Sequence, residues 1–321
     1  MRRPRRYAIM NAFARPILFA TVLVSSAACV PASAPVAPAP GPAPRYRVVA
    51  TSSREETTFE RMAARLARAK VVFFGEQHDD PGTHAAEVEL LDAIGRSGRP
   101  VVLSLEMFER DVQGVLDDYL AGRVTEEQFL ARSRPWPRYA TDYRGLVELA
   151  KARGWRVLAA NVPRPTASAV GRAGLGVLDT LTAPGRVHAA RDLSCPKDDY
   201  RARFLAETRS HSAGSGTAPQ PGDTLPTALA ERFYLAQCVK DETMAESIVE
   251  ALRRAPRNAI AVHFNGSFHS DYGHGVVARV ERREPRWKLS VVTAVPARDP
   301  AGAPVAPHAG RADFLIFTRR D

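Results

Sequence analysis

The chain has 321 residues, of which 45% are hydrophobic, and its formal net charge at pH 7 is +10. Half of that excess is local, because residues 1–28 hold five arginines and no acidic residue, which leaves 40 basic residues against 35 acidic ones elsewhere. No long basic run remains outside this leader, so the charge argues against nucleic acid as a partner.

The first 28 residues have the pattern of an export signal. Arginines at the start are followed by an apolar run over 17–24 that is too short for a membrane span. Small residues over 25–28 lead into Cys29, as in a bacterial lipobox, so we expect lipidation of Cys29 after cleavage. Ordinary cleavage near 32–34 is the alternative and would remove Cys29. Either route predicts export, and lipidation predicts anchoring to the cell membrane or the outer membrane, facing the periplasm or the exterior.

Residues 29–46 are dominated by proline and alanine, a composition that cannot form a core and that typically gives a semi-stiff spacer. We therefore expect a tether over 29–46 and a folded domain over 47–321.

Within that domain, helical and strand patterns alternate. Helices are expected at 59–69, 84–94 and 142–153, two more within 110–133, and an inserted, mainly helical subdomain at about 166–252. Short apolar runs predict strands at 71–74, 101–105, 156–160, 259–264, 289–292 and 314–317. Strands separated by helices predict an α/β fold, with a mostly parallel sheet flanked by helices.

Polar residues follow several of these strands. Glu76 and His78 come directly after the first, Glu106 ends the second, and His263 lies at the end of the fourth. Because the carboxyl ends of parallel strands meet at one edge of a sheet, we expect these four side chains in one crevice. They could hold a divalent metal, act as a base with an oriented imidazole, or form a polar floor under a ligand.

A structural interpretation competes with the functional one. Polar residues after a strand often cap the next helix, and we assign Asp79 and Asp80 to that role. His84 is expected in the first turn of the same helix and could serve either purpose.

Two cysteines, Cys195 and Cys238, remain after the leader. In an oxidising compartment such a pair predicts a disulfide, and two free buried thiols are the alternative. No Cys-x-x-Cys or Cys/His finger spacing is present in the sequence, so a structural zinc site is not expected.

Five segments resemble, in order, the ChaN-like haem-binding lipoprotein family, which lies in a superfamily with erythromycin-esterase-like and Tiki-type hydrolases. The resemblance covers roughly 45–292 and rests on FFGEQHDDPGTH, LSLEMFERDVQ, WPRYATDYRGLVELAKARGWRVLAANVPR, YLAQCVKDETMAESIVEAL and HFNGSFHSDYGHGV. It implies an α/β domain with a small helical domain. In the superfamily, the residues that match Glu76, His78 and His263, with Glu106, belong to the reactive crevice.

The resemblance also implies a haem cofactor, a role in haem or iron acquisition, and a homodimer with haem held between subunits. The family is associated with a tyrosine ligand, and we rank Tyr200 first, with Lys197 and His269 as further haem contacts. The chain has no Cys-x-x-Cys-His, so any haem is noncovalent. The alternative function is an exported hydrolase that uses the Glu/His crevice.

Overall fold

The computed structural model describes residues 45–212 and 227–320, so the predicted leader, Cys29 and most of the tether lie outside the described residues. The described residues belong to one unit, Pro44–Asp321. None of its described helices is both long enough and apolar enough to cross a membrane.

One eight-stranded sheet organises the described residues, in the order β2-β1-β8-β7-β3-β6-β4-β5. All neighbouring pairs from β8 to β5 are parallel, and only the pairs made by β1 are antiparallel. The strands are β1 (Tyr46–Ala50), β2 (Glu55–Thr57), β3 (Val71–Glu76), β4 (Val101–Glu109), β5 (Arg156–Asn161), β6 (Ile260–Gly266), β7 (Leu289–Ala297) and β8 (Phe314–Arg319). The mostly parallel α/β fold is confirmed, and β1 and β2 are strands that the sequence patterns did not predict.

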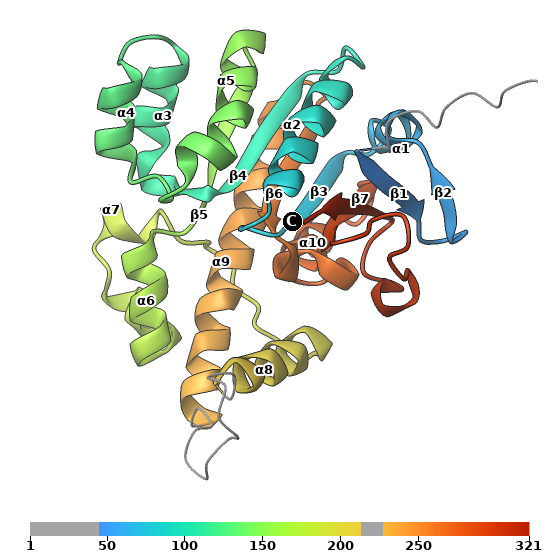
Figure 1. The fold of residues 1–321 in the computed structure, drawn as a ribbon. Coiled ribbons are helices and arrows are strands. Elements are labelled where there is room, and N and C mark those ends of the chain that lie inside the picture. The colour runs from blue at the N-terminus through green and yellow to red at the C-terminus, as the bar shows by residue number, and fades with distance from the viewer. Residues whose placement is uncertain (1–44, 213–226, 321) are drawn as a thin grey trace, which may run out of the picture. The chain divides into compact units, whose positions relative to one another are not determined.

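Helices cover both faces of this sheet (Figure 1). The helices are α1 (Phe59–Leu66), α2 (Pro81–Gly95), α3 (Gln113–Leu120), α4 (Glu126–Ser133), α5 (Arg144–Arg153), α6 (Arg164–Ala173), α7 (Ala183–Arg186), α8 (Asp199–Ser212), α9 (Thr227–Arg254) and α10 (Gly275–Arg283). Helices α1 to α5 pack with one set of alternating strand residues, which includes Val72 and Phe74 of β3. Helices α9 and α10 pack with the other set, which includes Val71 and Phe73. Successive residues of one strand therefore serve opposite faces.

The segment between β5 and β6 is helical, as the sequence predicts, but it is not wholly separate from the α/β body. The long helix α9 runs beside the sheet and continues past it, where α6 and α8 flank it (Figure 1). Its second half buries Met244, Ile248 and Leu252 against the sheet. That apolar stripe at helical spacing makes the end of α9 part of the main core.

The turn after β3 is fixed by a buried helix cap. Asp80 precedes Pro81 at the start of α2, and its Oδ2 accepts hydrogen bonds from the backbone N–H and the hydroxyl of Thr83 at 2.7 and 2.6 Å. Thr318 of β8 donates a third bond to the same oxygen at 2.7 Å. The capping role is confirmed for Asp80, whereas Asp79 forms an exposed ion pair with Arg320.

Candidate functional site

Glu76 and His78 form the first contact of the candidate site. Glu76 is the last residue of β3 and is 1% exposed, and its Oε1 contacts Nδ1 of His78 and accepts the hydroxyl hydrogen bond of Tyr143 at 2.8 Å. About half of the His78 side chain is exposed, and its ring meets Trp136 edge to face at 5.1 Å. Burial lowers the pKa of His78, but the hydrogen bond and charge of Glu76, with the charge of Glu106, outweigh it and raise the pKa overall.

Glu106 lies on the other face of the sheet, toward α9. Its Oε2 accepts the backbone N–H of Gly266 at 2.8 Å, and its Oε1 lies 3.2 Å from Nε2 of His269. Burial raises the pKa of Glu106, yet the charges of His269, Lys240 and His78 hold it well below its ordinary value. Glu106 is therefore a carboxylate in the interior of the protein.

His269 supplies the charge that balances this carboxylate. Its Nδ1 lies 2.6 Å from Oδ1 of Asp241 in α9, so the ring sits between two buried acids. Burial lowers the pKa of His269, but the charges of Glu106 and Asp241 raise it to about 10. The hydroxyl of Tyr200 donates to the other Asp241 oxygen at 2.7 Å. Glu106, His269, Asp241 and Tyr200 thus form one hydrogen-bonded chain on the α9 side.

His263 lies deeper than the other predicted residues. Its Nδ1 is 2.9 Å from the hydroxyl of Ser104 in β4, and its side chain is buried. Burial lowers the pKa of His263 to about 4, so the imidazole is neutral. No described group forms a hydrogen bond with its Nε2. His263 is consequently a neutral ring below the edge of the sheet and not a surface base.

Gly266 lets the two sides of the site approach one another. A Cβ atom at this position would lie 2.8 Å from Nε2 of His78 and 3.8 Å from Oε2 of Glu106. The imidazole therefore packs against the bare backbone where β6 ends. The carboxyl ends of β3, β4 and β6 do meet at one edge of the sheet, as the sequence predicted. Because side chains alternate along a strand, however, Glu76 and Glu106 lie on opposite faces, and His78 lies between them against Gly266.

The predicted haem contacts do not share a surface in this structure. Tyr200 and His269 are buried and are joined through Asp241, whereas Lys197 is exposed. The hydroxyl that would ligate iron is already bonded to a carboxylate.

The Cys195–Cys238 disulfide is confirmed and ties the segment before α8 to α9.

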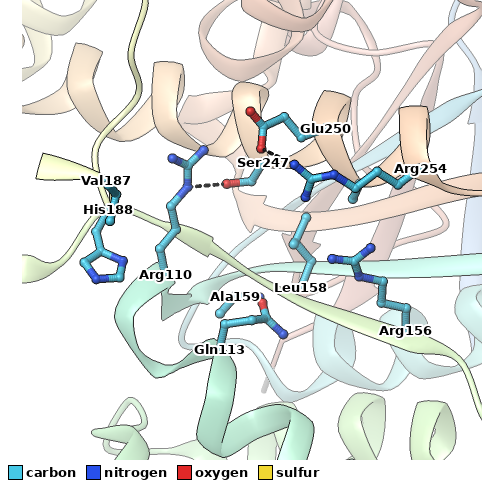
Figure 2. A pocket seen from close by; sticks show the side chains of 11 residues that line it. Arg110, Gln113, Arg156, Leu158, Ala159, Val187, His188, Ser247, Glu250 and Arg254 are labelled. Carbon is cyan, nitrogen blue, oxygen red and sulfur yellow. Dashed lines mark hydrogen bonds and ion pairs between the residues drawn. The ribbon is translucent and has the colours of Figure 1, made fainter. Parts of the chain in front are cut away.

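Two separate hollows open on the described surface, and one of them adjoins these residues. One, of about 260 Å³, opens beside the His78 side and is lined by Trp136, Asn161, Arg164, Lys240 and Glu109 among others. The second lies between β5 and α9, away from the Glu/His residues (Figure 2). In Figure 2 the side chains of Arg110, Arg156 and Arg254 gather around Leu158 on β5, with His188 at one end.

The sequence patterns assigned no definite role in the site to four residues that the structure places there: His84, Glu87, Tyr143 and Asp241. His84 and Glu87 belong to a buried group behind Glu76, on the α2 side. The usable signal for Asp241 is an acidic residue in a helix whose neighbouring positions are apolar and buried. Helical spacing alone did not reveal that Asp241 faces inward.

Comparison with known proteins agrees with this architecture. Residues 62–280, about two thirds of the chain, match the family described as haem-binding uptake, Tiki superfamily, ChaN. The structure resembles that of ChaN of Campylobacter jejuni with cofacial haem binding, with a TM-score of 0.65 and 16% identity over 86% of this chain and 97% of that one. An erythromycin esterase mutant in its open conformation is more distant, with a TM-score of 0.43 and 13% identity over 85% and 82% of the two chains.

A chloroplast protein of Arabidopsis thaliana, RETICULATA-RELATED 5, is 26% identical over 254 residues, which are 74% of this chain and 33% of that protein. This chain thus spans about a third of the length of that curated relative. The family match extends from α1 into α10 and includes every residue of the Glu/His site. By that match, the chain belongs to the ChaN family of haem-binding uptake proteins in the Tiki superfamily.

Proposed function

We propose that this protein binds haem noncovalently and serves haem or iron acquisition as an exported, lipid-anchored protein. The family match over 62–280 carries the proposal. Export and anchoring are supported by the arginine-rich leader and by the small residues before Cys29. A haem has an apolar ring, two carboxylates and an iron that takes axial ligands, so its site should combine cations, apolar surface and a free donor atom.

The hollow of Figure 2 offers the cations. We call it the arginine hollow; it comprises two adjoining cavities of about 230 and 550 Å³ that share Arg110, Val187 and Glu250 in their walls. Five arginines face two glutamates there: Arg110, Arg156, Arg186, Arg191 and Arg254 against Glu246 and Glu250. The excess of positive charge suits the propionates of a haem.

The same hollow offers apolar surface and a free imidazole. Val187 is 66% exposed, the most exposed of the described large hydrophobic residues, and Leu158 lies in the floor. His188 is half-buried beside Val187, and its ring makes no hydrogen bond or ion pair with any described residue. We therefore place the iron near His188, and Tyr200 is a ligand only if its bond to Asp241 opens.

A haem titration followed by absorbance tests this proposal. The purified protein should develop a saturable Soret band, and His188→Ala should shift or abolish it. Removing one arginine contact with Arg156→Ala should weaken binding about tenfold, which corresponds to about 1.4 kcal/mol. Arg68→Ala is a matched control, because Arg68 is exposed on the other side of the sheet, in the turn just after α1.

Two results would count against the proposal in different ways. Absence of saturable binding would refute the haem function. Normal binding by His188→Ala with loss in Tyr200→Phe would refute the arginine hollow and support the tyrosine ligand predicted from the sequence. Sedimentation with and without haem tests the expected homodimer.

Hydrolysis at the Glu76–His78 pair is a second candidate function. A buried carboxylate holds Nδ1 of a half-exposed imidazole, the arrangement by which a histidine is oriented as a general base. Lys240 and Arg164 line the adjacent hollow and could bind an anionic substrate. Turnover of an ester or amide panel that disappears in His78→Ala and Glu76→Gln, but not in His188→Ala, would support this function; no turnover by the unchanged protein would reject it.

A further inference from the structure

A second group of polar residues lies behind Glu76, on the face of β3 that α2 and α5 cover. Glu76, His84 and Glu87 each offer a ligand atom, and these atoms all lie within 4.8 Å of one another. The three residues are 1%, 4% and 0% exposed. This group has no part in the haem proposal, and only Glu76 belongs to the predicted crevice.

His84 is surrounded by hydrogen-bond acceptors. Its Nδ1 lies 3.0 Å from Oε2 of Glu87, and its Nε2 lies 3.3 Å from the backbone oxygen of His78 and 3.4 Å from Oδ2 of Asp142. A neutral imidazole has one N–H, so one of its nitrogens must direct a lone pair at an oxygen. That repulsion is relieved only if another proton or a cation enters the group.

Two carboxylate oxygens of this group also lack a hydrogen-bond donor among the described residues. Oε2 of Glu76 and Oε1 of Glu87 are buried and receive a hydrogen bond from no described donor. The ion pairs of these two acids within the described chain are with histidines alone, Glu76 with His78 and Glu87 with His84. Arg138 is nearby but pairs with Asp142 at 2.7 Å. Two buried acids whose ionic partners in the described chain are histidines alone are costly to keep charged, so a further proton or cation would stabilise the group.

We propose that Glu76, His84 and Glu87 bind one divalent transition-metal ion, such as Zn²⁺ or Mn²⁺. Two carboxylates and an imidazole suit these ions, and a charge of +2 cancels that of the two acids. Ligand atoms around such an ion are about 3–4 Å apart, so small side-chain rotations complete the site. Nε2–H of His84 then donates to the backbone oxygen of His78 or to Asp142, as metal-bound histidines usually do.

A shared proton is the competing solution. Burial, with the charge and hydrogen bond of Glu76, raises the pKa of Glu87 well above its ordinary value. A proton held between the two acids would also remove one negative charge. Glu87→Gln separates the two solutions, because glutamine imitates the protonated acid but is a poor metal ligand.

The test uses haem-free, chelator-treated protein titrated with Zn²⁺ in a calorimeter, together with metal analysis of the protein as purified. We expect one equivalent to bind and to raise the melting temperature, with at least a hundredfold weaker binding in Glu87→Gln and in His84→Asn. Glu89→Gln is the matched control, since Glu89 lies on the same helix and its side chain is 40% exposed in a pair with Arg45. It should bind Zn²⁺ as the unchanged protein does.

Failure of the unchanged protein to bind one equivalent of Zn²⁺ or Mn²⁺ overturns the proposal. Unchanged binding by both variants overturns it as well. If the unchanged protein takes up no metal and Glu87→Gln is as stable as it is, the two acids share a proton instead. If one variant does not fold, the other and the melting shift of the parent decide the question.

Discussion

Nε2 of His269 lies 3.2 Å from Oε1 of Glu106, where β4 and the turn after β6 meet. The contact places an imidazolium and a carboxylate in the interior, and Asp241 holds the other side of the ring. His263, six residues earlier, is buried without an acid in hydrogen-bond contact and is neutral. Two histidines of one segment therefore have opposite protonation preferences.

Stability should depend on pH in opposite ways through these two rings. The folded pKa of His269 is raised to about 10, so its stabilisation is complete below the ordinary value of 6.5 and is lost as the pH rises toward 10. The folded pKa of His263 is lowered to about 4, so its contribution is complete above 6.5 and is lost as the pH falls toward 4. Melting temperatures from pH 4 to 10 should peak near neutrality. His263→Gln should flatten the acidic side alone, and an unchanged acidic side would contradict the assignment.

The two sides of the candidate site should respond differently to loss of a histidine. His269→Ala leaves Glu106 and Asp241 buried without their cation and should cost about 3–5 kcal/mol of unfolding free energy. His78→Ala should cost less than about 1 kcal/mol, because His78 is half-exposed and Glu76 keeps its bond to Tyr143. Urea unfolding measures both. A cost of about 1–3 kcal/mol for His78→Ala would make His78 a structural residue.

A side chain at Gly266 is predicted to displace His78. In Gly266→Ala the new methyl group would lie 2.8 Å from Nε2 of His78, so the half-exposed imidazole must move aside, at a cost of up to about 1 kcal/mol. Gly114→Ala in α3 is the control, because nothing lies within 4 Å of its added Cβ. It should be neutral or stabilise by up to about 1 kcal/mol. Equal stability of the two variants would show that His78 does not pack on Gly266.

The sequence predicted the six parallel strands because each is a short apolar run followed by polar residues. It did not predict β1 and β2, since β2 has three residues, two of them exposed acids, and β1 follows a proline-rich stretch. It placed Glu76 and Glu106 at one edge correctly. They lie on opposite faces because successive side chains of a strand alternate between the faces of the sheet. Apolar runs locate a strand only to within a few residues, so they do not predict the face on which a strand-end residue lies. The role of His269 depends on Asp241, a contact between segments that no local pattern encodes.

The contribution of the disulfide to the free energy of unfolding can be measured directly. Cys195 and Cys238 are 43 positions apart, and closing such a loop stabilises by about 4 kcal/mol on the chain-entropy model. The double variant Cys195→Ser with Cys238→Ser should lose about 2–5 kcal/mol in urea unfolding. A reductant should have no further effect on it. Equal stability of parent and variant, with the bond present by peptide mapping, would contradict this entropic account.

Membrane attachment is the last prediction, and it rests on the sequence alone. If Cys29 carries the lipid, Cys29→Ser in the full chain should move the protein from the membrane fraction to the soluble fraction, because the apolar run over 17–24 is too short to span a bilayer. Cys195→Ser is the matched control: it removes a cysteine of the folded domain and should leave the protein on the membrane. Mass spectrometry of the parent should find the lipid on an N-terminal Cys29. Cleavage after residues 32–34 with release of the parent would instead show an ordinary signal peptide.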